Sequence, residues 1–223
     1  MSVYPEDIMN KLLFCGDPHG QFVHIIDRVR QTRPAAVVLL GDLDLPQPFE
    51  TVFASILDFT ELWFIHGNHD TDNERCYDHL FHSSLSDKNL HGKVKDIGGL
   101  RIAGLGGVFR GQIWYPPENP RYRTKADFIA RCGKGNRWRG GLPLKHRSSI
   151  FPEDFELFKG QKADILVCHE APSSHPHGFA AIDDLADSLG VKQIIHGRHH
   201  EPFIYSDPRY VNVGFRGFYE ILV

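Results

Sequence analysis

The stretch LLFCGDPHG, residues 12–20, is an apolar run that ends abruptly in a glycine and an aspartate. The apolar run predicts a buried β-strand, and the Gly16-Asp17 pair predicts a tight turn directly after it. Such a turn would raise the side chains of Asp17 and His19 from the carboxyl end of the strand, where open α/β sheets bind ligands. A carboxylate and an imidazole two residues apart suit half of a metal site, although Asp and Gly are also ordinary turn formers.

Four further apolar runs end in the same way, each in a residue type that binds metals. They are residues 37–40, followed by Gly41-Asp42; 62–65, followed by HGNHD at 66–70; 165–168, followed by His169; and 194–195, followed by HGRHH at 196–200. Random placement would not put Asp, Asn or His at the end of every strand. The sequence therefore predicts a ligand-binding edge to which several strands contribute.

These motifs resemble the calcineurin-like metallophosphoesterases in order and approximate spacing, from Asp17 to His200. The opening GDPHGQ is also similar to the first motif of the serine/threonine phosphoprotein phosphatases, whereas GDLDLP at 41–46 differs from the longer GDxxDRG pattern of that branch. The resemblance implies an α/β fold, a four-layer α/β/β/α sandwich in which two mixed sheets are flanked by helices.

The spacing of apolar residues predicts the elements between the motifs. Residues 19–30 and 49–57 are expected to form amphipathic helices, so the chain begins as a parallel βαβαβ unit. Residues 94–105, split by Gly98-Gly99, predict a hairpin, and in the resembled family a second, mixed sheet begins near it. The remaining expected elements are helices at 152–158 and 180–189, the latter ended by Gly190, and strands at 203–205, 210–213 and 218–223 that complete the second sheet.

Length and composition favour one globular domain over residues 1–223. Hydrophobic residues make up 41% of the chain and charged residues 24%, and the net charge of −3 excludes a general preference for polyanions. Cys15 and Cys168 lie inside apolar runs, and no CxxC pair occurs, which is typical of a reducing compartment. Residues 1–10 lack the apolar core of a signal peptide, and no run is long enough to span a bilayer. We therefore expect a cytoplasmic protein without a membrane segment.

Residues 110–150 form a basic, aromatic stretch that we expect to be a cap-like insertion. It contains seven Arg and three Lys but only one Glu and one Asp, a net charge of +8, so the rest of the chain carries about −11. One interpretation is a cap that attracts a phosphorylated substrate, in which case neutralising Arg137 and Arg139 would raise KM. The other is a solvated excursion whose aromatic residues only pack it down.

The resemblance implies a dinuclear metal centre. Two metals roughly 3.5–4 Å apart neutralise phosphate oxygens and lower the pKa of a bridging water, so that a metal-bound hydroxide attacks in line. Asp42 is the best bridging candidate. A ligand set of Asp, His and Asn suits two divalent transition metals, manganese before iron, zinc or nickel. By the resemblance, the first metal takes Asp17, His19, Asp42 and His200, and the second takes Asp42, Asn68 and His169.

His69 follows Asn68 directly and is predicted to be catalytic, as a general acid or a charge stabiliser near the leaving group. Asp70, or alternatively Asp44, could hold the His69 ring in the donating tautomer. A purely structural role for His69 is the alternative.

The last motif departs from the family pattern Gly-His-x-His, because Arg198 stands where an imidazole is expected. A guanidinium has no lone pair with which to bind a cation. Three alternatives follow: His199 or His196 replaces the missing ligand, the second metal site is weak, or Arg198 clamps the phosphate.

The sequence favours a metal-dependent hydrolase of phosphate esters, a phosphomonoesterase or a phosphodiesterase. Its substrate would be a phosphorylated small molecule, a nucleotide or a phosphoprotein. One alternative is a non-catalytic binding module with a partly eroded metal site, which Arg198 favours. Another is a nucleic-acid end-processing phosphoesterase, which the basic stretch permits although no defined nucleic-acid-binding motif is present.

Overall fold

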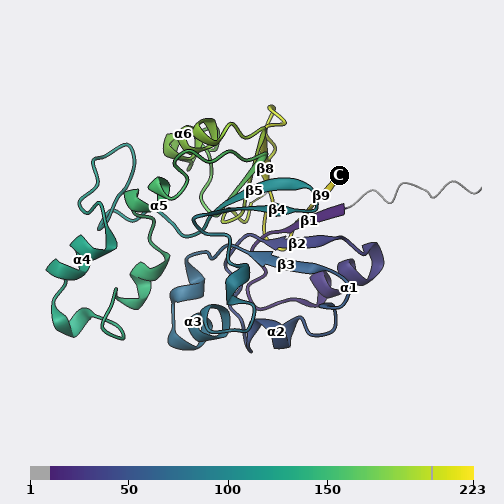
Figure 1. Ribbon diagram of the computed structural model, residues 1–223, viewed down its shortest axis with the longest axis horizontal. Helices are drawn as coiled ribbons and strands as arrows, with labels where there is room; N and C mark the ends of the chain where they lie inside the picture. The colour runs from purple at the N-terminus through teal and green to yellow at the C-terminus, as the bar shows by residue number, and fades with distance from the viewer. Residues whose placement is uncertain (1–10, 202) are drawn as a thin grey trace, which may run out of the picture.

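The computed structural model describes residues 11–201 and 203–223, in which two β-sheets lie face to face between helices (Figure 1). The prediction about residues 1–10 therefore falls outside the described residues. None of the helices within the described ranges is long and apolar enough to cross a membrane.

The helices and strands follow one another as expected for a βαβ unit at the start and a second sheet later in the chain. In order they are β1 (Lys11–Cys15), α1 (Val23–Thr32), β2 (Ala36–Leu39), α2 (Phe49–Val52), β3 (Glu61–Phe64), η1 (His69–Thr71), α3 (Glu74–Phe81), η2 (Ser86–Lys88), β4 (Lys93–Ile97), β5 (Leu100–Leu105), α4 (Lys125–Arg131), η3 (Lys134–Asn136), η4 (Leu144–Ser148), α5 (Pro152–Glu156), β6 (Ile165–Cys168), α6 (Ala180–Leu189), β7 (Gln193–His196), β8 (Tyr210–Asn212) and β9 (Phe218–Leu222).

Both sheets are mixed. The first has the strand order β3-β2-β1-β9, in which only the β1–β9 pair is antiparallel. The second has the order β4-β5-β6-β7-β8, in which only the β4–β5 hairpin is antiparallel. Gly98 and Gly99, both with positive φ, form the turn of that hairpin. The predicted four-layer α/β/β/α sandwich is confirmed.

Alternate residues of the strands point to different cores, which is why the strands read as continuous apolar runs. In β1, Leu12 and Phe14 join the core between the two sheets, whereas Leu13 and Cys15 face the helices of the first sheet. In β6, Ile165 and Val167 face the other sheet in the same way. The central strands are therefore buried on both faces, and their ends are free to present polar side chains.

Helices cover the outer face of each sheet (Figure 1). Ile25 of α1, Phe49 of α2 and Leu80 of α3 pack against the first sheet. Ile182 and Leu185 of α6 pack against the second. The end of α6 at Gly190, which has a φ of 69°, is as predicted.

The C-terminal part of the chain differs from the prediction. Phe203–Tyr205 forms no strand, and Phe218–Leu222 pairs with β1 in the first sheet and not with the second. Alternation of apolar residues identifies a strand, but it does not identify the neighbour with which that strand pairs. Only β8 completes the second sheet as predicted.

Two helices also differ from the prediction. The helix expected at 49–57 ends at Val52 and continues as turns. The helix α3 was not predicted; its start is capped by Asn73, whose side chain accepts the N–H of Cys76.

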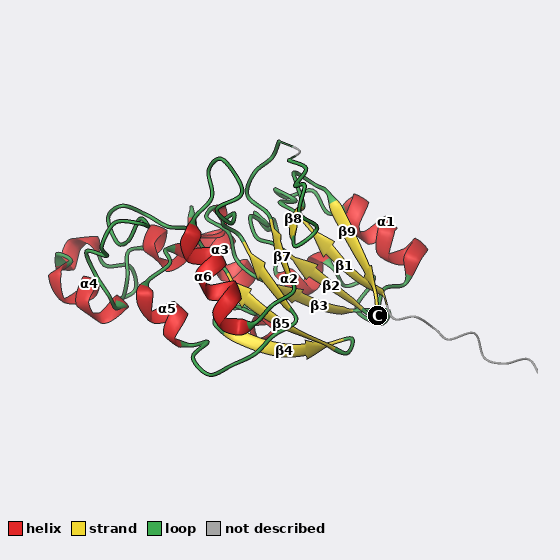
Figure 2. Ribbon diagram, turned by 90° about the horizontal axis from the view of Figure 1, so that it is seen from above, coloured by secondary structure: helices red, strands yellow, loops and turns green. Residues whose placement is uncertain are grey.

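The insertion, residues 110–150, lies beside the sheets and not on either of their faces. In both views α4 is at the end of the molecule opposite α1 (Figures 1 and 2). A small apolar cluster of Ile113, Leu142 and Phe151 forms its core, with Trp114, Tyr122, Phe128 and Ile129 packed around it. The interpretation that the aromatic residues pack this stretch down therefore holds for several of them.

Candidate metal centre

The predicted site residues lie in loops that follow the carboxyl ends of five strands. Asp17 and His19 follow β1, Asp42 follows β2, Asn68 follows β3, His169 follows β6, and Arg198, His199 and His200 follow β7. Since β1 to β3 belong to one sheet and β6 and β7 to the other, the site draws on both sheets.

The centre of the site is a buried group of Asp17, Asp42 and His169, whose ligand atoms all lie within 4.8 Å of one another. His169 Nε2 is 3.3 Å from Asp42 Oδ2, and His169 Nδ1 is 3.8 Å from Asp17 Oδ1. Nδ1 of His169 donates to the carbonyl oxygen of Leu40 at 2.8 Å, so Nε2 faces the carboxylates and has a lone pair for a cation once it loses its proton. This tautomer is the one that can bind a cation.

Several polar atoms of this group have no partner. Both carboxylate oxygens of Asp17 and Nε2 of His169 are buried and lack a hydrogen bond within residues 11–201 and 203–223. Leaving such atoms unpaired is costly, and a divalent cation would satisfy all three of them. The residues present therefore fit a divalent metal.

The electrostatics of the group point the same way. Burial, opposed mainly by His169, raises the pKa of Asp17 to about 6. Burial would lower the pKa of His169, but the Asp42 and Asp17 carboxylates raise it to about 9. The negative field that favours a proton on His169 is the field that would attract a metal cation in its place.

His19 and His200 close the site on its solvent side. His19 Nδ1 donates to Asp44 Oδ2 at 2.7 Å, and that hydrogen bond, against the effect of burial, raises the pKa of His19. His19 Nε2 lies 3.8 Å from Asp42 Oδ2 and 3.1 Å from His200 Nε2. His200 Nε2 in turn lies 3.9 Å from Asp17 Oδ2. All four predicted ligands of the first metal are thus brought together.

The backbone of these loops is unusually constrained. Asp17, His19, Asp42, Asp44 and Arg198 all have positive φ, between 28° and 68°. Residues other than glycine rarely adopt this conformation, and where they do, the surrounding structure must stabilise it. Such conformations cluster at functional sites, and here they aim carboxylate and imidazole groups at one point.

The glycines next to the ligands leave space for them. A Cβ at Gly67 would overlap Asp42 Oδ1 and come within 2.6 Å of His169 Cε1. A Cβ at Gly41, whose φ is 99°, would lie 2.7 Å from His169 Nδ1. The Gly-Asp and Gly-Asn pairs are therefore packing requirements of the site as well as turn signals.

The His69 ring is held by Asp72. His69 Nδ1 donates to Asp72 Oδ2 at 2.6 Å. The prediction that Asp70 or Asp44 holds this ring is wrong, because Asp44 bonds to His19 and the buried Asp70 carboxylate accepts backbone N–H groups.

Comparison with known proteins gives the family. The model of the calcineurin-like phosphoesterase family matches residues 10–202. An uncharacterised protein of Haemophilus influenzae is 46% identical over 208 residues, which make up 92% of this chain and 91% of that protein. This chain belongs to the calcineurin-like phosphoesterase family.

The fold of this calcineurin-like chain is also found among solved structures. TT1561 of Thermus thermophilus superposes with a TM-score of 0.56 at 16% identity, covering 94% of this chain and 91% of that one. A more distant match is a protein serine/threonine phosphatase from Saccharomyces cerevisiae. It covers 93% of this chain and 68% of its own, with a TM-score of 0.44 at 17% identity.

The calcineurin-like family is one of phosphoric ester hydrolases that typically bind divalent metals. Against its pattern, Arg198 occupies a distinctive place: Nη1 donates to Asn68 Oδ1 at 2.8 Å, and Nε lies 3.3 Å from Glu170 Oε2. The guanidinium thus contacts the oxygen through which Asn68 was expected to bind the second metal. Burial raises the pKa of Glu170, although the charge of Arg198 opposes this.

Of the two histidines proposed as substitutes for the missing imidazole, His196 is hydrogen-bonded elsewhere, whereas Nε2 of His199 is buried without a hydrogen-bond partner in the described residues. His196 is buried, and its Nε2 lies 2.7 Å from the hydroxyl oxygen of Tyr205. The ring of His199 stacks on that of His175, with centroids 4.0 Å apart. Neither belongs to the buried group of ligand atoms found within the described residues.

Sequence reasoning missed three residues of the site: Asp72, Glu170 and Arg110. Arg110 Nε and Nη2 donate to Ser149 and Ser148, and burial together with the charge of Arg198 lowers the pKa of Arg110. Glu170 had a usable signal, since it is an acidic residue directly after a strand-ending histidine. Arg110 and Asp72 had none, because each lies among many other charged residues.

Proposed function

We propose that this protein hydrolyses phosphate esters, monoesters or diesters, with two divalent transition metals, manganese before iron, zinc or nickel. The observation that carries the proposal is the buried group of Asp17, Asp42 and His169, with three unpaired polar atoms facing one another. Burying polar atoms that have no hydrogen-bond partner is unfavourable unless a cation joins them.

The residues of the chain would hold the metals in the arrangement that the resemblance implies. When bound, the metals would neutralise charge on the phosphate and favour deprotonation of the attacking water. His19 Nδ1–H donates to Asp44, and His169 Nδ1–H donates to the carbonyl oxygen of Leu40. In each ring Nε2 is therefore the nitrogen left for a metal. The proposed ligands are Asp17, His19, Asp42 and His200 for the first metal, and Asp42, Asn68 and His169 for the second.

His69 would act on the leaving group. Its Nδ1–H donates to Asp72, so in the doubly protonated ring the Nε2 proton is the one that can pass to the leaving oxygen. The His69 ring is near the site, since its centroid lies 5.3 Å from that of His19.

Arg198 would clamp the phosphate. Glu170 and Asn68 fix two sides of the guanidinium, which is the planar donor best suited to phosphate oxygens. The charge of Arg198 would thus replace part of the charge that a tightly bound second metal supplies.

Replacing Asp42 by Asn tests the proposal. Asp42→Asn should lower kcat/KM for 4-nitrophenyl phosphate and bis(4-nitrophenyl) phosphate at least about a hundredfold, because the bridging charge is lost. Bound metal, measured by plasma mass spectrometry, should fall as well. Asp184→Asn on the exposed face of α6 is the matched control. Near-normal turnover with full metal content would refute the proposal, whereas bound metal without turnover of any ester in the unmodified protein would favour a binding module.

Two variants, Arg198→Lys and Arg198→His, test whether Arg198 binds the phosphate or only stands in place of a metal ligand. Arg198→Lys keeps the charge but cannot contact Glu170 and Asn68 at once, so KM should rise roughly tenfold with a smaller change in kcat. Arg198→His should tighten metal binding, measured by calorimetry, and raise KM further. An unchanged KM in both variants would show that Arg198 does not touch the phosphate.

A further inference from the structure

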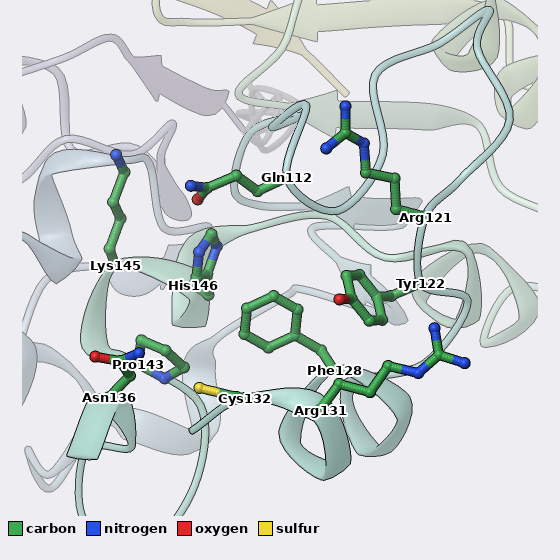
Figure 3. Close-up of a pocket in the computed structure, with 10 residues that line it drawn as sticks. All are labelled: Gln112, Arg121, Tyr122, Phe128, Arg131, Cys132, Asn136, Pro143, Lys145 and His146. Atoms are coloured by element: carbon green, nitrogen blue, oxygen red, sulfur yellow. The ribbon is translucent and has the colours of Figure 1, made fainter. Parts of the chain in front are cut away.

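The insertion contains a cavity of about 630 Å³ that is separate from the ligand set of the metal centre. Residues of α4, η3, η4 and the loop before α4 line it. In Figure 3 the polar ends of Lys145, Gln112 and Arg121 lie along one side of the view, the Phe128 ring is at the centre, and the Cys132 sulfur is on the opposite side. A hollow of this size, open to solvent, can hold a small organic molecule.

The cavity is positively charged and its cations are unpaired. Arg121, Arg131 and Lys145 line it, no acidic residue does, and none of the three has a carboxylate within 4.0 Å in the described part of the chain. Two other cations of the insertion pair with carboxylates: Lys125 with Asp154, and Arg139 with Asp78. Arg121, Arg131 and Lys145 therefore give the cavity a positive lining that no carboxylate neutralises.

An aromatic strip forms the apolar part of the lining. The Tyr122 and Phe128 rings meet edge to face with centroids 4.9 Å apart, and the His146 ring lies 4.9 Å from that of Phe128. Burial and the charges of Arg110 and Lys145 lower the pKa of His146 to about 4, so this ring is neutral at pH 7. Aromatic faces of this kind stack with planar rings.

We propose that this cavity binds a small organic phosphate that carries an aromatic ring. The ring would pack on Phe128 and Tyr122, and the positive charges of Arg121, Arg131 and Lys145 would attract the phosphate. Gln112 and Asn136, whose amide groups also line the cavity, add donors and acceptors for polar edges of the ring.

Hydrogen-bonded side chains run from the cavity toward the metal centre. His146 Nδ1 lies 3.0 Å from Ser149 Oγ, which accepts from Arg110, and Ser148 Oγ lies 2.6 Å from the hydroxyl of Thr71 next to Asp70. Since none of the proposed metal ligands lines the cavity, its occupancy can be measured apart from turnover.

Cys132 reports occupancy directly. It lines the cavity, whereas Cys15, Cys76 and Cys168 are buried. The intact, metal-loaded protein is labelled with iodoacetamide, a neutral reagent, in increasing concentrations of phenylphosphonate, which cannot be hydrolysed. We expect phenylphosphonate to slow alkylation of Cys132, and methylphosphonate or phenol to do so only at much higher concentrations.

Variants locate the binding. Arg121→Gln with Lys145→Gln should raise the half-protecting concentration of phenylphosphonate roughly tenfold or more, because hydrogen bonds to charged groups are lost. Lys134→Gln is the matched control, since this exposed cation of the same insertion does not line the cavity. Protection should persist in Asp42→Asn, even where catalysis is lost. Absence of protection, equal weakening by Lys134→Gln, or loss of protection in Asp42→Asn would each overturn the proposal.

Discussion

The metal centre and the insertion are held by different kinds of contact. At the centre, buried Asp70 accepts N–H groups of Asp42, Leu43 and Gly67, so the loops are tied together through their backbones. The insertion relies on a small apolar cluster and on side-chain pairs at the surface, such as Arg139 with Asp78.

This difference suits the two regions to different roles, the metal centre to catalysis and the insertion to ligand recognition. A site fixed by backbone bonds and left-handed residues tolerates little displacement, as a constellation of metal ligands requires. A segment held by exposed side chains can change its lining residues at small cost to the fold. We therefore expect the same kind of substitution to have very different effects in the two regions.

The same substitution, glycine to alanine, at one position in each region gives the strongest test: Gly67→Ala at the metal centre and Gly135→Ala in the insertion. At Gly67 the new Cβ would overlap the Asp42 carboxylate, so the ligands must move and kcat/KM for an aryl phosphate should fall about a hundredfold or more. At Gly135 a Cβ meets nothing within 4 Å, and activity should stay within about twofold of the unmodified protein. Equal activity of the two variants would show that the centre is as adaptable as the insertion.

Asp154→Asn tests the contact that attaches the insertion to the rest of the protein. The Asp154 carboxylate is fully buried, pairs with Lys125 at the start of α4, and accepts the N–H of Phe151. Its loss should lower the free energy of unfolding by about 1.5–3 kcal/mol at pH 7, measured with urea. Glu156→Gln, an exposed change on the same helix, should cost less than about 0.5 kcal/mol.

The effect of Asp154 should depend on pH. Burial would raise the pKa of Asp154, but His91 and Lys125 hold it below its usual value. A carboxyl group with a lowered pKa in the folded state stabilises the protein above the pKa of the unfolded chain, about 3.9, and loses this contribution as the pH falls further. The difference between the unmodified protein and Asp154→Asn should thus shrink below about pH 4, and a difference that stays constant from pH 7 to pH 3 would contradict the assignment.

Arg139→Gln should have the weakest effect. The guanidinium is exposed, bonds to Asp78 of α3 and stacks on Trp138, so it braces the insertion and does not line the cavity. KM for an aryl phosphate should change less than about twofold, with a small decrease in Tm, because exposed ion pairs contribute little. This revises the expectation from the sequence that neutralising Arg137 and Arg139 raises KM; a clear increase in KM that weakens with salt would restore it.

The sequence predicted those parts of the site that depend on strand ends. Asp17, Asp42 and His169 each end a buried apolar run, and parallel strands bring such ends to one edge. The convergence of Asp17 and Asp42 follows from this pattern, whereas that of His169, which lies on the second sheet, was implied only by the family resemblance.

The partners of these residues could not be predicted, because they depend on the local turn. His69 begins the 3₁₀-helix η1, in which side chains three residues apart lie above one another, so Asp72 and not Asp70 meets the ring. The place of β9 was missed for a related reason, since its alternation is compatible with either sheet.

The pairing of β9 with β1 has a consequence for synthesis on the ribosome. Lys11 pairs with Leu222, about two hundred residues later in the chain. Until that last strand emerges, β1 has an unpaired edge, and such edges recruit other chains. The nascent chain thus carries Asp17 and His19 on an incomplete sheet for nearly the whole of translation, and shielding of β1 during that time should decide how much of the protein reaches its native state.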